Sequence, residues 1–211
     1  MGSTLFYNST PQYRLVATAT NHGALNGTIV VSGISGTIAL IVVAIGSGST
    51  SPSMTDSSGN TYSYTTAYGS GVLTRQAYVV NPTTASSMTF TITALNWSAV
   101  VMVFSTQATV TPALDQQTGN NSIAATSIAT GSITPLFPAE LIVASAATGT
   151  GSTGSPGVVA GYNLIFGAFF AGISQGIVVY YKSQLYIQAE NVAFAGTSMQ
   201  YYGALIASYK N

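Results

Sequence analysis

The chain has 211 residues, and only eight of them carry a formal charge, four basic and four acidic. A typical soluble domain is about a quarter charged, and four basic residues exclude both a phosphate-neutralising surface for nucleic acid and an anchor for anionic membranes. The chain has no Cys, which excludes disulfides and thiolate metal sites. About a quarter of the residues are Ser or Thr, and an uncharged polar surface offers little electrostatic repulsion between neighbouring molecules.

The first twelve residues precede the first strand-like segment, and Pro11 interrupts them. We interpret residues 1–12 as an N-terminal extension that could act as an arm between subunits. Residues 13–211 show no break in composition, so we expect one β-sandwich domain there. Residues 1–10 lack the basic and apolar regions of a signal peptide. We therefore expect either a leader removed before Met1 or release of the protein by lysis or within a particle.

Twelve segments rich in β-branched and aromatic residues follow one another at the spacing typical of a sandwich or barrel. The run 37–46 is almost wholly apolar and predicts a central strand buried on both faces. Met88, Phe90 and Ile92 alternate with Thr and predict a half-buried strand. No segment has a helical period bounded by caps. The expected strands lie at 13–20, 26–33, 37–46, 60–68, 73–81, 86–94, 98–106, 126–133, 139–147, 158–166, 176–184 and 200–210.

Gly, Ser, Pro and Asn gather in three clusters at 46–53, 118–122 and 148–157, which we interpret as turns. The uncharged stretch 162–181 is long enough to span a membrane, but its glycines and aromatic residues favour two strands. The pattern as a whole predicts an all-β protein. We expect an antiparallel two-sheet sandwich of about a dozen strands with the topology of a jelly roll.

The sequence MTDSSGNTYSY from Met54, followed by RQAYVVNPTTASSMTFTIT from Arg75, resembles a module found in secreted bacterial proteins and phage structural proteins. Members of this family show a T-D-S-x-G-N-T-Y turn, a strand that ends in Tyr-x-x-Asn, and then a strand in which Thr and Val alternate. Downstream, Asp115 matches the Asp that opens a variable loop, and 141–144 matches a Leu-hydrophobic-Val-Ala strand. The resemblance implies a concanavalin-like jelly-roll sandwich that serves as a scaffold without a fixed activity.

The turn motif consists of Asp56, Gly59, Asn60 and Tyr62. Asp56 and Asn60 could supply oxygen ligands to calcium, but a chain with four acidic residues is poorly equipped to build a multi-carboxylate cage. We favour an Asx-type turn, in which Asp56 bonds the backbone two residues on and Gly59 or Asn60 adopts a positive φ. We therefore expect no metal and no cofactor.

Residues that could act in catalysis are scarce. His22, the only His, lies in the turn-rich segment TNHGALNG, where we expect a solvated turn and not the base of a catalytic triad. A carboxylate pair for glycoside hydrolysis would have to come from Asp56, Asp115, Glu140 and Glu190. We expect these groups to pair with Lys or Arg instead of converging. The sequence thus predicts a protein that is not an enzyme.

Aromatic residues offer a further candidate surface, because Tyr and Trp can stack on sugar rings or lie at protein interfaces. We favour an interface or the core over a sugar site. The adjacent Tyr pairs at 180–181 and 201–202 lie on expected strands, so one member of each pair should point into the core. The candidate sugar-binding or interface residues are Tyr64, Tyr68, Trp97, Tyr181 and Tyr202.

These features predict a non-enzymatic structural protein that self-assembles on a virion surface, as a head decoration or tail component. Its partners would be copies of itself and other virion or surface proteins. One alternative is a subunit of an extracellular filament or surface layer joined by strand donation. Another is a carbohydrate-binding adhesin that uses Trp97 and surface Tyr residues. In each case we expect a location on a virion or outside the cell, with no nucleic acid partner and no membrane span.

Overall fold

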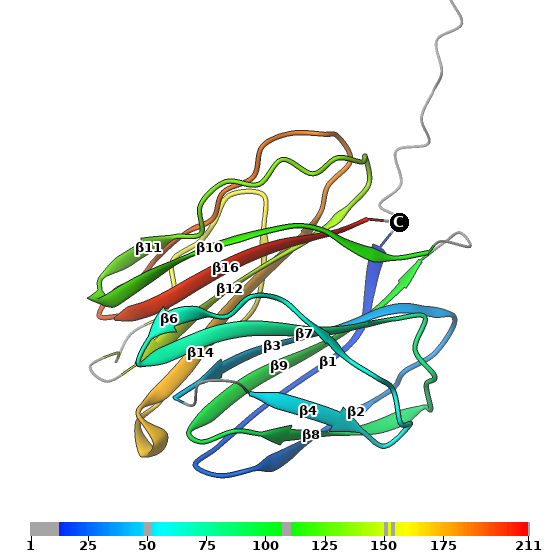
Figure 1. Cartoon of the computed structure of the whole chain (residues 1–211), viewed down its shortest axis with the longest axis horizontal. Helices are drawn as coiled ribbons and strands as arrows, with labels where there is room; N and C mark the ends of the chain where they lie inside the picture. The colour runs from blue at the N-terminus through cyan, green and yellow to red at the C-terminus, as the bar shows by residue number, and fades with distance from the viewer. Residues whose placement is uncertain (1–12, 49–51, 107–110, 150–151, 153–154, 211) are drawn as a thin grey trace, which may run out of the picture.

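The computed structural model describes residues 13–48, 52–106, 111–149, 152 and 155–210 (Figure 1). These residues form sixteen β-strands and a short 3-10 helix, η1, at Ala171–Ile173. All strand pairings within the sheets are antiparallel. The expected all-β antiparallel sandwich is therefore confirmed. The expected extension at residues 1–12 lies outside the described residues.

Two large sheets form the centre of the molecule. The first contains β1 (Tyr13–Gly23), β3 (Ile38–Ser47), β5 (Ser63–Tyr64), β6 (Tyr68–Ser70), β7 (Val72–Val80) and β9 (Trp97–Thr106). Its strand order is β1-β9-β3-β7-β5, and β6 also pairs with β7. The second contains β10 (Ala113–Ala125), β12 (Leu141–Gly149), β13 (Asn163–Phe170), β14 (Gln175–Ser183) and β16 (Tyr201–Lys210). Its strand order is β10-β16-β12-β14-β13.

Two small sheets cover the outer faces of the large ones, which gives the layers seen in Figure 1. One contains β2 (Gly27–Ser32), β4 (Ser53–Asp56) and β8 (Ser87–Thr93), in the order β2-β8-β4. The other pairs β11 (Ser127–Ala129) with β15 (Ala193–Ala195). Three apolar cores result, one between each pair of adjacent layers.

The central strands are buried on both faces because their side chains alternate between two cores. In β3, Ile41 and Val43 face the core shared with the small sheet β2-β8-β4, whereas Leu40 and Val42 face the core between the two large sheets. Every residue of β3 is buried. The apolar run in the sequence therefore reflects a strand with no solvent-facing side, as expected for a central strand.

A few buried polar groups link the two large sheets. The Gln76 side-chain amide donates to the Val143 carbonyl at 3.1 Å, and Tyr209 OH donates to Gln76 Oε1 at 2.8 Å. The hydroxyls of Thr74 and Ser145 lie 2.8 Å apart. Because a buried polar group without a partner is costly, these bonds favour one relative position of the two sheets.

Several expected element boundaries are wrong. Residues 118–122, expected as a turn, lie inside β10 and pair with β16. The strand expected at 158–166 begins at Asn163 and continues to Phe170. The segment 60–68 contains only β5 and the first residue of β6. Residues 118–122 continue the strand because their backbone pairs with β16. The pairing outweighs the turn preference of these residue types, since β propensity depends strongly on context.

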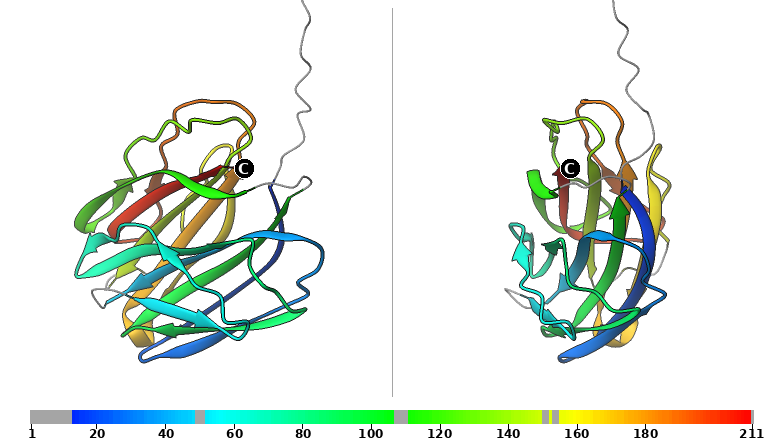
Figure 2. Two further views of the ribbon diagram at one scale, coloured as in Figure 1. Left: turned by 45° about the vertical axis from the view of Figure 1, so that its right-hand side comes forward. Right: turned by 90° about the vertical axis from the view of Figure 1, so that its right-hand side faces the viewer.

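The two lateral edges of the central sandwich differ. On one side, which we name the closed edge, the segment leading into β6 reaches across to β10. The Thr66 N–H donates to Gln117 Oε1 at 2.9 Å, and the Gly69 N–H donates to Asn121 Oδ1 at 2.6 Å. On the other side, which we name the open edge, the edge strands β1 and β13 lie near each other without pairing (Figure 2).

Close packing at the closed edge yields a test of the fold. A Cβ on Gly203 would overlap the Tyr68 backbone carbonyl, so Gly203→Ala should lower the free energy of unfolding by roughly 1–3 kcal/mol. The matched control is Gly172→Ala, because a Cβ there meets no atom within 4 Å, and it should change stability by less than about 0.5 kcal/mol. Urea unfolding followed by circular dichroism measures both variants. Equal effects would contradict the described contact.

Candidate functional site

The open edge is tied together at both ends. At one end, Ser183 Oγ donates to the Tyr13 carbonyl at 2.9 Å, and Tyr13 OH donates to the Lys210 carbonyl at 2.8 Å. At the other end, the rings of His22 and Phe170 stack with their centroids 3.6 Å apart. Between these contacts β1 pairs with β9 and β13 pairs with β14, but β1 and β13 form no ladder with each other. The facing edges of both large sheets are therefore unpaired here.

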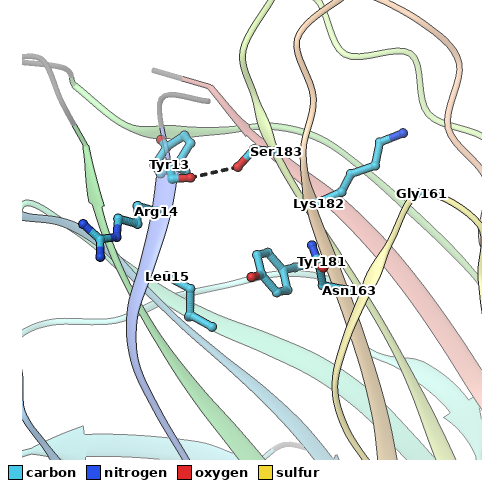
Figure 3. A pocket seen from close by; sticks show the side chains of 8 residues that line it. All are labelled: Tyr13, Arg14, Leu15, Gly161, Asn163, Tyr181, Lys182 and Ser183. Atoms are coloured by element: carbon cyan, nitrogen blue, oxygen red, sulfur yellow. Dashed lines mark hydrogen bonds between the residues drawn. The ribbon is translucent and has the colours of Figure 1, made fainter. Parts of the chain in front are cut away.

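A cleft of about 460 Å³ opens between the start of β1 and strands β13 and β14. Figure 3 shows Leu15 and Tyr181 pointing towards each other across it, whereas Arg14 and Lys182 point away from one another. Leu15 and Tyr181 are half-buried and continue the core between the two large sheets. The cleft thus exposes the margin of that core to a molecule that approaches the open edge.

Both strands of the open edge are poor in charge, since β13 has none and β1 has only Arg14. Leu164 of β13 is 50% exposed. Proteins commonly protect strand edges with charged residues, Pro or bulges. Each strand has one bulge near its start, between Leu15 and Ala17 in β1 and between Leu164 and Phe166 in β13. The rest of each strand is regular and can hydrogen-bond to an added strand.

His22 lies within β1 and not in the expected turn, because its backbone pairs with Ser98 of β9. The residue is exposed, and its ring stacks on Phe170. The expected solvated turn is therefore wrong in its local structure. His22 instead helps to hold one end of the open edge.

Asp56 organises the turn that follows β4. Its Oδ1 accepts the backbone N–H groups of Ser58 at 2.8 Å and Asn60 at 3.2 Å, and its Oδ2 accepts the Asn60 side-chain amide at 2.8 Å and Tyr62 OH at 2.7 Å. Gly59 has a φ of +74°. Burial alone would raise the pKa of Asp56, but the hydrogen bonds from Tyr62, Asn60 and Ser58 outweigh it and lower the pKa. This geometry is that of an Asx-type turn.

The structure places Trp97 inside the protein, where it is 1% exposed and its Nε1 donates to the Leu25 carbonyl at 2.6 Å. Its ring is therefore not available to a sugar. Tyr180 and Tyr201, one member of each adjacent Tyr pair, are also buried. Both lie in the core beneath the small sheet β11-β15.

The other candidate aromatic residues do not form one surface. Tyr64 of β5 lies under the Arg75 guanidinium, 4.3 Å from the ring centroid. Tyr68 packs on Gly119 and Gly203 at the closed edge, and Tyr181 lines the cleft at the open edge. The remaining residue, Tyr202, packs on a glycine at the end of β12. A sugar-binding platform would need several of these rings on one face.

Asp115 and Glu140 come together, so the expectation that the four carboxylates stay apart is wrong for this pair. Asp115 lies on β10 and Glu140 immediately precedes β12, and β16 runs between these strands in the sheet. Burial raises the pKa of Glu140 to about 7, and the neighbouring Asp115 also raises it, whereas the nearby Ser208 hydroxyl and the hydrogen bond from the Phe137 N–H act in the opposite direction. This contact was not predicted, because Asp115 was expected to open a variable loop and not to lie on a strand.

Glu190, by contrast, pairs with a basic residue as expected. It is 5% exposed, and its carboxylate accepts Lys182 Nζ at 2.5 Å, Tyr162 OH at 2.8 Å and the Gln188 side-chain amide at 2.6 Å. Three donors satisfy this buried charge, as a buried ion pair requires. In the part of the chain that the structure describes, no three His, Asp or Glu side chains are grouped so as to hold a metal ion.

Comparison with known protein families, with curated proteins and with solved structures finds no match to this chain. Among the described residues, no helix has the length and apolar character needed to cross a membrane. The function is therefore inferred from the geometry of the open edge and from the distribution of charge.

Removal of the Asp56 carboxylate should destabilise the protein and change its acid sensitivity. Asp56→Ala leaves four donors without their acceptor, which should cost about 2–3 kcal/mol of unfolding free energy. Because folding lowers the pKa of Asp56 from 3.8, its stabilisation is present above that pH and is lost as the pH falls through the folded value. Urea unfolding at a series of acidic pH values should therefore show a shallower acid-induced loss in the variant. Parallel pH curves would contradict this role.

Proposed function

We propose that this chain is a non-enzymatic structural protein whose copies associate through the open edge of the sandwich. The observation that carries the proposal is that two unpaired edge strands, β1 and β13, lie next to each other. Together these two strands contain a single charged residue, Arg14. Unpaired edges of this kind are templates for pairing with another chain. Leu15 and Tyr181 at the cleft add apolar surface that an incoming strand would cover.

The low overall charge supports the same proposal. With four basic and four acidic residues the net charge is zero, so copies of the chain approach one another without a long-range barrier. The turn at Asp56 and the strands around it resemble the jelly-roll module of secreted bacterial and phage structural proteins. We therefore propose that the assembly lies on a virion surface, with other virion proteins as further partners, or outside the cell as a filament or surface layer.

Residues 1–12 are our candidate for the strand that a neighbouring copy contributes. They directly precede β1, whose first residues line the cleft. Twelve residues span at most about 40 Å when extended, which is longer than the eight-residue strand β13. The segment contains Leu5, Phe6 and Tyr7 and has no charged residue, so its side chains suit the apolar margin of the core.

The adhesin and enzyme alternatives have weaker support. An adhesin would need Trp97 at the surface, and Trp97 is buried. A carboxylate pair does occur, at Asp115 and Glu140, but Glu140 is 0% exposed and a substrate would have to reach it to be protonated. We therefore favour a structural role over both.

Association through β13 is tested by placing a charge on it. Leu164→Lys should weaken self-association of the full chain by at least about tenfold, because burying an unpaired ammonium at an interface costs more than about 1.4 kcal/mol. Leu95→Lys is the matched control, since Leu95 is similarly exposed, at 55% against 50% for Leu164. Sedimentation velocity over a wide range of concentration measures both. A chain that stays monomeric throughout, or equal effects of the two variants, would refute the proposal.

The role of residues 1–12 is tested separately by deleting them. If they supply the added strand, the shortened chain should fold but not assemble, and a peptide of residues 1–12 should bind to it. If the shortened chain assembles as well as the full chain, the arm has no such role, although association through the open edge would still stand. Sedimentation velocity and titration with the labelled peptide distinguish these results.

A further inference from the structure

The 133–140 loop, between β11 and β12, is anchored along its whole length. At its ends, Ile133 and Glu190 exchange backbone hydrogen bonds of 3.0 and 2.8 Å, and the Gln184 N–H donates to the Glu140 carbonyl at 2.8 Å. Through these bonds the 133–140 loop runs beside the 184–190 loop, as Figure 1 shows above the second large sheet. The loop between these anchors has no backbone ladder of its own, so side chains must hold it.

Two carboxyl groups hold the middle of the 133–140 loop through successive residues. Asp115 Oδ2 accepts the Leu136 N–H at 2.9 Å, and Glu140 Oε1 accepts the Phe137 N–H at 3.0 Å. Each carboxyl group therefore uses one oxygen for the loop backbone. Both bonds can be kept only while the two carboxyl groups stay close together.

The second carboxylate oxygen of Glu140, Oε2, has no hydrogen-bond donor among the described residues. Glu140 itself is 0% exposed. Its surroundings instead include the Asp115 carboxylate, which holds the adjacent loop amide and raises the pKa of Glu140. Two ionised carboxylates close together repel each other, and a proton bound to one of them removes the repulsion.

We propose that Glu140, held in its protonated form beside Asp115, acts with it as a pH-sensitive latch on the 133–140 loop. While the proton is bound, the pair holds the Leu136 and Phe137 amides together. When the proton leaves to solvent, the two carboxylates repel each other, and at least one of the two amides is released.

The groups around the pair are consistent with a transition near neutral pH. Asp115 faces Glu140 from β10, Tyr13 faces it from β1, and the Ser208 hydroxyl faces it from β16. Lys210, also on β16, has its Nζ 4.6 Å from the Phe137 ring centroid. Burial first, and the Asp115 charge second, raise the pKa of Glu140 to about 7, so the proton is held in mildly acidic solution and lost in mildly basic solution.

The latch controls the position of exposed apolar side chains. Leu136 and Phe137 are 60% and 42% exposed, and Tyr186 and Ile187 of the adjacent loop are 68% and 55% exposed. These four residues belong to two loops that backbone hydrogen bonds hold side by side. Release of the 133–140 loop would therefore rearrange the apolar surface there.

Amide hydrogen exchange between pH 5 and pH 8, with EDTA present, tests the latch. After correction for the intrinsic exchange rate, protection of the Leu136 and Phe137 amides should fall by at least about tenfold, since pH 8 lies about one unit above the transition. Amides of β12 should keep their protection. In Glu140→Gln, whose side-chain amide is a permanent donor to Asp115, the loop should stay protected at both pH values. The proposal would be overturned if amide protection in the wild type does not change with pH, or if it falls equally in Glu140→Gln.

Global stability gives a second, independent measurement. The pKa of Glu140 rises on folding from 4.5 to about 7, so the stabilisation is complete below pH 4.5 and is lost as the pH rises to 7. The urea midpoint should therefore decline across this window and level off above it. Glu140→Gln should abolish the decline, and if that variant does not fold, Asp115→Asn should shift it to lower pH.

Asp56→Asn serves as the control for the loss of a carboxylate, because the pKa of Asp56 is lowered and its own pH window lies below 3.8. This variant should keep the decline between pH 4.5 and pH 7 that the wild type shows. A decline that persists unchanged in Glu140→Gln, or that disappears in Asp56→Asn, would contradict the assignment of the proton to Glu140.

Discussion

Burial of the central strands of both large sheets on both of their faces is the constraint on which the rest of the structure depends. Central strands such as β3 and β12 are buried along their whole length, so the middle of each large sheet has no solvent-facing side. What these sheets offer to the exterior is their edges. One edge is closed by the segment around β6 and its bonds to β10, and the other is open between β1 and β13. The asymmetry between the two edges limits the proposed association to the side of β1 and β13.

Only one of the eight charged residues, Arg14, lies on the two strands of the open edge. Five of the eight charged side chains surround the 133–140 and 184–190 loops, and they are Asp115, Glu140, Lys182, Glu190 and Lys210. Asp56 holds a turn and Arg75 stacks on Tyr64. These charges have local structural partners, so few are left to act as the charged residues that usually block strand edges. The open edge therefore has little protection by charge, because the chain has few charged residues and most of them have partners elsewhere.

Much of the fold could be predicted from periodicity, because an apolar run such as 37–46 or a Thr alternation such as 87–93 reports directly on burial. The strand β10 could not, since its residues 118–122 are typical of turns. Gly119 is nevertheless needed there, because Tyr68 packs directly on it, and Asn121 is needed because its side chain accepts the Gly69 N–H. Those requirements come from the neighbouring sheet and leave no local pattern.

The candidate site was predictable only in part, for a related reason. The turn around Asp56 is local, so its residue types are informative on their own. The contact between Asp115 and Glu140 depends on the register of β10 and β12 against β16, and the open edge depends on which strands end each sheet. Trp97 was a surface candidate because Trp can stack on sugar rings. Its ring instead lies in the core, where its Nε1 donates a hydrogen bond to the Leu25 carbonyl.

The most direct measurement is amide hydrogen exchange of the full chain, compared between dilute and concentrated protein. If copies associate through the open edge, residues 13–23 and 163–170 should gain protection as the concentration rises, while β10 at the closed edge should not change. Protection that is independent of concentration at β1 and β13, or that rises at β10 instead, would contradict association through the open edge.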